Sequence, residues 1–213
     1  VDTLQTGFQN SNDTGGPTGQ YNYLGNLGSP RMSRIFFDRG EESQFIFTDP
    51  LDFSILTPDE VTFMNTYSPY TNLTYHKSFS NRNSEERFKS YYAVNANSKL
   101  GFGFFVDYIY GRGMYNNQST AMFNTGLFSS YMGDKYNMHF IFSYDNQKLR
   151  ENGGITDDRY ITDPLSMAEG KKQYSSTDIP TMLNKVWNHN TSIHTFLTHR
   201  YNLGFYKKKK DSV

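Results

Sequence analysis

The chain contains no cysteine, only one tryptophan and no long run of apolar residues. The lack of cysteine excludes a disulfide scaffold, a thiolate metal site and a cysteine nucleophile. A membrane-spanning helix needs about 18 or more consecutive apolar residues, and no segment approaches that length. Because the 21 basic and 21 acidic residues cancel, no basic field favours nucleic acid as a partner. Nothing in the composition requires a cofactor, and we expect none.

Aromatic residues are abundant by contrast, with 18 Phe and 17 Tyr among 213 residues. The mean hydropathy is nevertheless −0.72. Charged residues make up 20% of the chain, below the usual share of about a quarter. A polar chain that is rich in aromatic rings and holds 17 Gly is untypical of a cytosolic α/β enzyme. The composition therefore favours an all-β protein.

From about residue 70 onward, apolar and polar side chains alternate in six segments. Within 136–144, aromatic and methionine side chains fill the even positions, and Asn137, His139 and Ser143 lie between them. A period of two is typical of a β-strand with one apolar and one polar face. The expected strands cover 71–75, 88–96, 100–110, 121–131, 136–144 and 193–205.

The length of these segments favours a membrane protein. Most are about 9–13 residues long, whereas globular strands most often have about five or six, and a tilted strand needs roughly 9–11 to cross a bilayer. Short turns at 97–99 and 133–135 alternate with longer connections at 78–87, 111–119 and 147–190, as in outer-membrane barrels. The sequence predicts an all-β fold, a transmembrane antiparallel up-and-down β-barrel. A soluble extracellular β-sandwich is the alternative.

Two regions are expected along the chain. Residues 1–69 are irregular, and their β-like runs at 33–37 and 44–48 are too short to span a bilayer, so this segment lies in the periplasm or plugs the lumen. Residues 70–213 supply the barrel strands, with a long extracellular loop at 147–190. Six spanning strands are fewer than the roughly eight of the smallest barrels. An open sheet would expose unpaired edges to lipid, so we expect an incomplete barrel in this sequence.

Five stretches of the sequence resemble the Putative porin family of Bacteroidota outer membranes. They are 22–30, 34–39, 67–75, 107–115 and 151–160. The resemblance spans nearly the whole chain and implies an outer-membrane β-barrel whose export signal has been removed. It supplies no catalytic residues, and the transported substrate of such proteins is generally unknown. Family members are much longer, so the chain resembles the N-terminal part of such a barrel.

The polar face of the expected strands is the candidate lining of the lumen. Because its side chains carry charges of both signs, it predicts either a weakly selective polar pathway or an interior closed by ion pairs. The candidate lining residues are Lys89, Asn95, Asp107, His139, Asp145, His194 and Arg200.

Tyrosines near the ends of the apolar face are candidates for an aromatic girdle. Tyr136 and Tyr144 are separated by roughly 20 Å along the membrane normal, at ~3.3 Å per residue and ~40° of tilt, close to the ~25 Å apolar band of a barrel. The candidate girdle residues are Tyr108, Tyr110, Tyr131, Tyr136 and Tyr144.

No catalytic or metal site is expected. His189, His194 and His199 recur every five residues, a spacing that places strand neighbours on opposite faces. The acidic residues of the long loop are a weak Ca²⁺ candidate, and a solvated acidic cluster is the simpler interpretation. No nucleophile lies in register with a base and an orienting group, so we expect no enzyme. The acidic residues concerned are Asp157, Asp158 and Asp163.

The leading hypothesis is a porin-like barrel that passes or binds small polar solutes through its lumen in a bacterial outer membrane. A second hypothesis is a structural or accessory barrel in a larger outer-membrane complex for assembly, secretion or nutrient uptake. The N-terminal segment or the 147–190 loop would then bind other outer-membrane or periplasmic proteins. A soluble sugar-binding β-sandwich comes third. The lipid bilayer is the partner common to the first two hypotheses.

Overall fold

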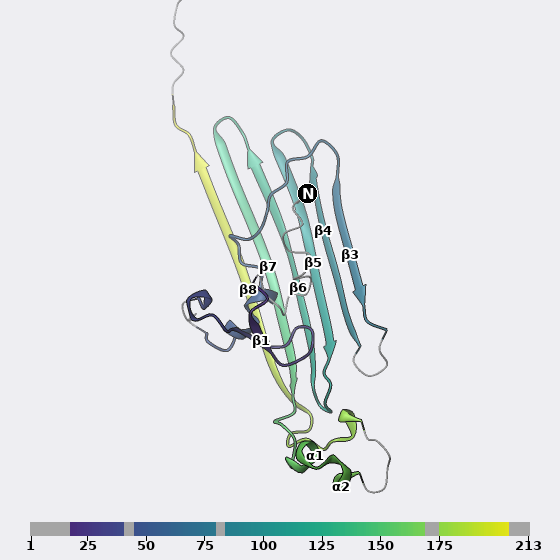
Figure 1. The fold of residues 1–213 in the computed structure, drawn as a ribbon. Coiled ribbons are helices and arrows are strands. Elements are labelled where there is room, and N and C mark those ends of the chain that lie inside the picture. The colour runs from purple at the N-terminus through teal and green to yellow at the C-terminus, as the bar shows by residue number, and fades with distance from the viewer. Residues whose placement is uncertain (1–17, 41–44, 80–83, 169–174, 205–213) are drawn as a thin grey trace, which may run out of the picture.

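The computed structural model describes residues 18–40, 45–79, 84–168 and 175–204. Six strands form one antiparallel sheet in which each strand pairs with its neighbours in sequence (Figure 1). The sheet is open, with β3 at one edge and β8 at the other. The strands are β3 (Tyr70–Lys77), β4 (Glu85–Asn95), β5 (Leu100–Arg112), β6 (Ser119–Met132), β7 (Tyr136–Glu151) and β8 (Val186–Tyr201). The expected mostly-β meander is confirmed.

The remaining elements are short. None of the helices in the described residues is long and apolar enough to cross a bilayer. A small sheet pairs β1 (Tyr21–Tyr23) with β2 (Arg31–Ser33). The helices are η3 (Phe36–Asp38), η4 (Asp49–Ser54), α1 (Arg159–Thr162), α2 (Pro164–Met167) and η5 (Ser176–Asp178).

The strands differ from the expected ones mainly at one end of the sheet. β7 continues to Glu151 and β8 begins at Val186, so their connection is 152–185 instead of 147–190. Both faces of β7 carry polar side chains beyond Tyr144, which hides the strand from an apolar–polar pattern. The β-like run at 33–37 contains only the end of β2 followed by a 3-10 helix, and 45–48 holds no strand. Gln44 and Phe205 lie outside the described residues.

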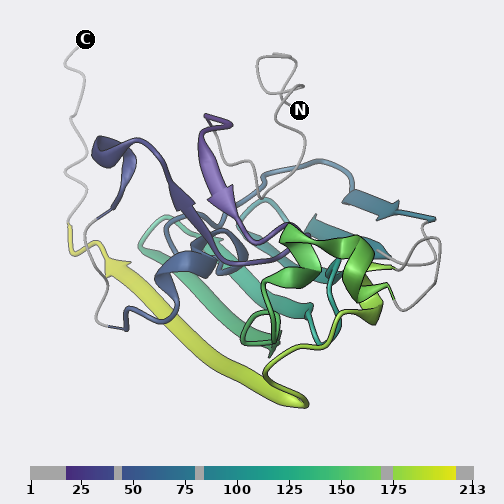
Figure 2. The same cartoon turned by 60° about the horizontal axis from the view of Figure 1, so that its bottom comes forward.

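The two faces of the sheet are in different surroundings. We call the face that holds Phe105 and Ile141 the inner face and the opposite one the outer face. The described part of 18–69 lies against the inner face (Figure 2). It covers two apolar clusters, one formed by Val61 with Ala93, Phe105, Phe128 and Ile141, the other by Leu51 with Ile109, Met122 and Leu149.

Glycines shape the inner face where aromatic rings lie on it. Gly103 pairs with Phe128 across β5 and β6, and Phe105 pairs with Gly126 two positions along. A Cβ atom at either glycine would clash with the ring of the facing phenylalanine. The rings therefore lie over backbone, and Phe63 of the N-terminal segment packs edge-on against Phe128 with ring centroids 5.6 Å apart. This packing fixes the position of the segment on the sheet.

The outer face has no comparable cover in the described residues, and its large apolar side chains are exposed. On β5 the apolar row runs from Leu100 to Tyr110. The ten residue steps between them, at ~3.3 Å each and ~40° of tilt, extend roughly 25 Å along a membrane normal. Contiguous exposed apolar surface of this size is typical of an interaction with a membrane or another protein. Its members include Leu73, Phe88, Phe102, Phe104, Phe123, Leu127, Ile193 and Leu197.

Candidate functional site

A tight turn of the N-terminal segment binds the inner face near the end of β5 that leads to 113–118. Asn26 and Ser29 are each only 1% exposed. The Asn26 side chain donates to Thr120 Oγ1 over 3.2 Å, and Thr120 Oγ1 donates to the Leu27 carbonyl over 2.6 Å. The Leu27 N–H donates to Glu85 Oε1 over 2.7 Å. These bonds satisfy the polar groups that the turn buries, as buried polar groups require.

Glycines on both sides make this approach possible. Gly25 and Gly28 have φ of 94° and 77°, values that glycine adopts at little cost. A Cβ at Gly111 would clash with the Leu27 carbonyl oxygen. The close approach therefore depends on the Asn-Leu-Gly turn and on Gly111 together.

A second anchor lies further along the segment, at η4. Asn124 donates to the Ser54 carbonyl over 3.0 Å, and Gln147 Nε2 donates to Ser54 Oγ over 2.7 Å. Leu51 is buried beside it in the second apolar cluster. Asp145 is 1% exposed beneath the same segment. The segment is thus held to the sheet by polar and apolar contacts at two separate places.

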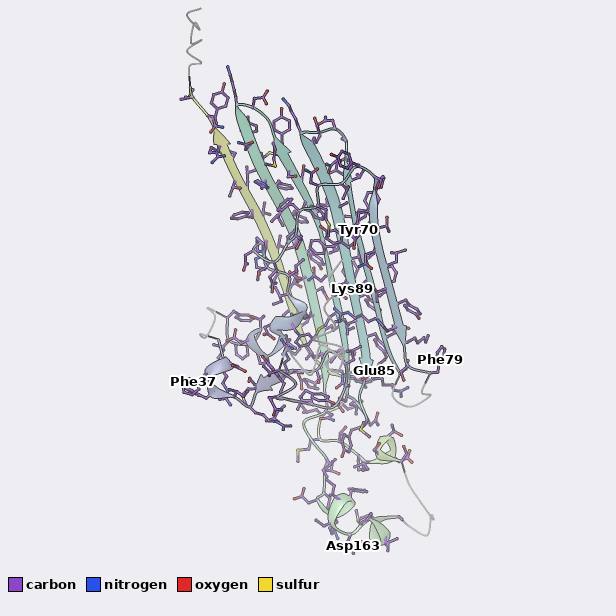
Figure 3. The ribbon with its side chains drawn as sticks, turned by 45° about the horizontal axis from the view of Figure 1, so that its top comes forward. Phe37, Tyr70, Phe79, Glu85, Lys89 and Asp163 are labelled. Atoms are coloured by element: carbon purple, nitrogen blue, oxygen red, sulfur yellow. The ribbon has the colours of Figure 1, made fainter. Side chains whose placement is uncertain are left out.

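A cleft of about 600 Å³ remains between the N-terminal segment and the β3–β5 part of the inner face. From the segment it is lined by residues of 52–64, including Glu60 and Met64. Figure 3 shows Tyr70 and Lys89 on the strands beside it. The sheet contributes Tyr70, Asn72, Thr74, Arg87, Lys89, Ser90, Tyr91, Phe105, Val106, Asp107 and Asn124. The cleft is therefore mixed in polarity, with aromatic and charged side chains adjacent.

Charged side chains of both signs lie at its floor. Arg87 binds Asp107 through two hydrogen bonds, Nε to Oδ1 at 3.0 Å and Nη2 to Oδ2 at 2.6 Å. Lys89 Nζ lies 3.6 Å from the same Oδ2 and its side chain is 53% exposed. Paired arginine–carboxylate bonds of this kind hold both groups in a defined geometry. Two cations thus share one carboxylate, and Lys89 is the cation open to the cleft.

All seven candidate lining residues lie on the inner face, but only two of them line this cleft. Lys89 and Asp107 are cross-strand partners there. His139 packs edge-on against Phe63 at 5.1 Å, under the segment. Asn95 bonds to Asn65 over 2.5 Å near the short turns. The strand pairing places Asp145 opposite Ser192, and His194 and Arg200 on the edge strand β8, opposite Ser143 and Asn137.

Four of the five candidate girdle tyrosines lie toward the ends of the outer face, and Tyr144 does not. Tyr136 lies 6.1 Å from Tyr131 and 6.2 Å from His199, ring to ring, at the end with the short turns. Tyr108 and Tyr110 lie toward the other end of β5. Tyr144 is at mid-strand because β7 is longer than expected, and the next outward side chain is Asn146. His199 also faces outward, and the ring of Tyr136 beside it gives this polar side chain an aromatic neighbour on a mostly apolar face.

The acidic candidates of the long loop form local bonds with protein groups. Asp157 accepts three side-chain hydrogen bonds from Arg159, from Nε to Oδ1 and Oδ2 at 3.1 and 2.9 Å and from Nη2 to Oδ2 at 2.6 Å. These bonds lower the pKa of the Asp157 carboxyl. Asp163 accepts from the Ser166 N–H at the start of α2. Within the described residues, no group of three His, Cys, Asp or Glu side chains is arranged to hold a metal ion.

The residues that hold the N-terminal segment were not among the candidates. Asn26, Thr120 and Gln147 bond across more than 90 residues of sequence, and period-two alternation contains no information about such contacts. The closely spaced Gly25 and Gly28 were the available indication, since two glycines around Asn-Leu mark a turn with positive φ.

Comparison with curated proteins and with solved structures finds no match. The model of the family described as Putative porin matches residues 1–213. Proteins of that family are typically not enzymes, and membership implies association with a membrane and suggests the outer membrane. The chain belongs to the Putative porin family over its full 213 residues.

Proposed function

We propose that the chain contributes to a porin-like β-barrel that passes or binds small polar solutes on its inner face. The observation that carries the proposal is the contrast across one sheet. An exposed apolar face, roughly 25 Å deep, lies opposite a covered face that retains a cleft with charges of both signs. The proposed location is the outer membrane of a bacterium of the Bacteroidota type, reached with an export signal that is then removed.

In this proposal, the N-terminal segment occupies part of the lumen. Its two anchors hold it against β5–β7, and the cleft beside β3–β5 forms the path for solutes. The free edges of β3 and β8 must be paired in the membrane, because each unpaired backbone group in hydrocarbon costs several kcal/mol. The path would be weakly selective, since Lys89 and Asp107 oppose each other at its floor.

Planar-bilayer conductance of the purified full chain tests the proposal. We expect Asp107→Asn to shift the reversal potential in a KCl gradient toward anions, because Arg87 and Lys89 lose their shared carboxylate. Asp134→Asn is the matched control. It removes the same charge from the surface pair with Lys99, and selectivity should stay unchanged. A folded barrel that conducts no ions, or a chain that remains soluble without detergent, would contradict the proposal.

A second candidate function is a structural or accessory subunit of an outer-membrane complex. It is favoured by the extent to which the described part of 18–69 covers the inner face, and by the described part of the loop 152–185, which extends past the sheet (Figure 1). Such a barrel would co-purify with stoichiometric partners and conduct no ions. Purification from mild detergent followed by mass determination separates the two functions.

A further inference from the structure

Three outward-facing basic residues lie together at one corner of the sheet. Arg112 on β5 and Arg150 on β7 are both cross-strand partners of Ser119 on β6. Lys148 on β7 is the partner of Ala121, the next outward-facing residue of β6. Because Ser119 and Ala121 are small, they leave space between the longer basic side chains. The cluster belongs to the outer face, and the proposed solute path therefore does not use it.

Part of this cluster surrounds a small pocket. A cavity of about 160 Å³ is lined by Arg112, Arg150, Asn117, Gln118 and Thr177, among others. Its described lining provides guanidinium, amide and hydroxyl groups and includes no acidic residue. Arg150 donates to Asn117 Oδ1, and its buried Nε has no hydrogen-bond partner in the structure. A buried donor without an acceptor is costly, so an anion there would be stabilised.

The only tryptophan of the chain flanks the same corner. Lys148 Nζ lies 4.5 Å and Arg150 Cζ 5.7 Å from the centre of the Trp187 ring. These cation–π contacts hold both cations on the outer side of the sheet. Glu86, the described acidic residue on the outward rows of β4, pairs with Lys77 at 3.3 Å. The corner therefore keeps an excess of positive charge.

The position of this corner along the strands indicates which kind of anion it would bind. Arg112 follows Tyr110 on the outward row of β5, and Lys148 and Arg150 follow Tyr144 and Asn146 on β7. Tryptophan and tyrosine concentrate where the apolar band of a membrane meets the headgroups. In the membrane placement of the proposed function, on which this inference rests, the corner lies at the level of lipid phosphates on the long-loop side.

We propose that Arg112, Lys148 and Arg150 bind the phosphate group of a membrane lipid headgroup, with Trp187 at the edge of the acyl region. Arginine recognises phosphate through paired, charge-assisted hydrogen bonds, and lysine adds a point charge. The two guanidinium groups would contact the phosphate from the pocket, and Lys148 would approach it from the lipid side. A lipid bound in this way would hold the 113–118 connection and the long loop close to the membrane surface.

Titration of the detergent-solubilised full chain with defined ligands tests the site, read out by native mass spectrometry. The ligands are phosphatidic acid, phosphatidylcholine and inorganic phosphate. We expect phosphatidic acid to bind best and Arg112→Gln/Lys148→Gln to weaken it by about tenfold or more, as expected for the loss of two charge-assisted contacts. Lys99→Gln/Lys135→Gln removes the same charge at the opposite end of the sheet and should leave the affinity unchanged.

Folding and conductance are measured on the same preparations. If the double variant does not fold, Lys148→Gln alone should weaken phosphatidic acid binding severalfold and leave inorganic phosphate almost unaffected. A conducting barrel with equal affinity in the variant and its control would overturn the lipid site and leave the pore intact. Equal binding of inorganic phosphate and phosphatidic acid would overturn the lipid assignment. A protein that binds phosphatidic acid through these residues but never conducts contradicts the pore alone.

Discussion

The inner and outer faces of the sheet are made by the same strands and are both rich in apolar residues, yet they differ in two respects. The four glycines within the described strands, Gly101, Gly103, Gly111 and Gly126, all lie on the inner face. Buried polar side chains such as Asn124, Asp145 and Gln147 also lie there. The outer face instead carries large, exposed side chains between tyrosines.

This difference shows how one sheet can meet two kinds of surroundings. Glycines and buried amides serve a surface that must fit another part of the same chain closely, because backbone approach and specific hydrogen bonds need space and partners. Branched and aromatic side chains without polar partners need no specific packing in a fluid apolar solvent, because its molecules rearrange to fill the space around them. Substitutions on adjacent residues can therefore distinguish a packed face from a lipid face.

The largest expected effect comes from truncating an inner-face ring. Phe128 is 3% exposed and packs against Phe63 and Tyr91, so Phe128→Ala should lower the free energy of unfolding by about 3–5 kcal/mol. The next residue, Leu127, points outward and is 57% exposed. Leu127→Ala should cost only about 1–2 kcal/mol, because lipid chains would fill the space and no cavity would remain. Urea unfolding in liposomes measures both, and equal losses would contradict the contrast.

A charge in the middle of the outer face should have the next largest effect. Leu127→Lys is expected to cost about 2–4 kcal/mol in a bilayer, as for lipid-facing positions of barrels near the midplane. Tyr201→Lys, on the same face but at the rim of β8 and 57% exposed, should cost about 1 kcal/mol or less. The same unfolding assay compares them. If Leu127→Lys left the free energy of unfolding unchanged, this face would be in contact with water or a protein partner instead of lipid.

Gly111 offers a way to separate the N-terminal segment from the sheet. Because a Cβ there would clash with the Leu27 carbonyl, Gly111→Ala should displace the turn at 25–29 at a cost of about 1–3 kcal/mol. We expect faster proteolysis within the segment and a higher conductance. Gly40→Ala is the control, since a Cβ at Gly40 meets nothing within 4 Å. Unchanged proteolysis in the Gly111 variant would show that the segment does not depend on this contact.

The strands of this fold could be predicted from sequence much better than the packing on them. The two-residue period located β4 to β6 to within a few residues, because each has one face on which most side chains are apolar, interrupted by Ser90 in β4 and by Thr125 and Ser129 in β6. It failed beyond Tyr144, where Lys148 and Arg150 make the outward row polar outside the apolar band. The proximity of Lys89 and Asp107 follows from strand register, which alternation alone does not fix. The anchors at Asn26 and Ser54 depend on contacts distant in sequence, and only the glycine spacing indicated the first.

The smallest expected effect lies beyond both faces, in the loop 152–185, where Figure 3 places Asp163 well past the end of the sheet. Arg159 hydrogen bonds lower the pKa of the exposed Asp157 carboxyl. Because this pKa is lower in the folded loop than in the unfolded chain, the charged carboxylate stabilises the loop above the unfolded pKa. That contribution is lost as the pH falls through the folded value.

Replacing Arg159 should therefore move the acid response of the loop without affecting either face of the sheet. In Arg159→Gln, the pKa of Asp157 should return toward its ordinary value, so acid loosening of 157–163 begins at a higher pH. Arg159→Lys keeps the charge but loses the paired bonds, and should fall between the two. Carboxyl chemical shifts followed against pH measure the change. Identical titrations in all three proteins would mean that water already screens this pair completely, as it does many exposed ion pairs.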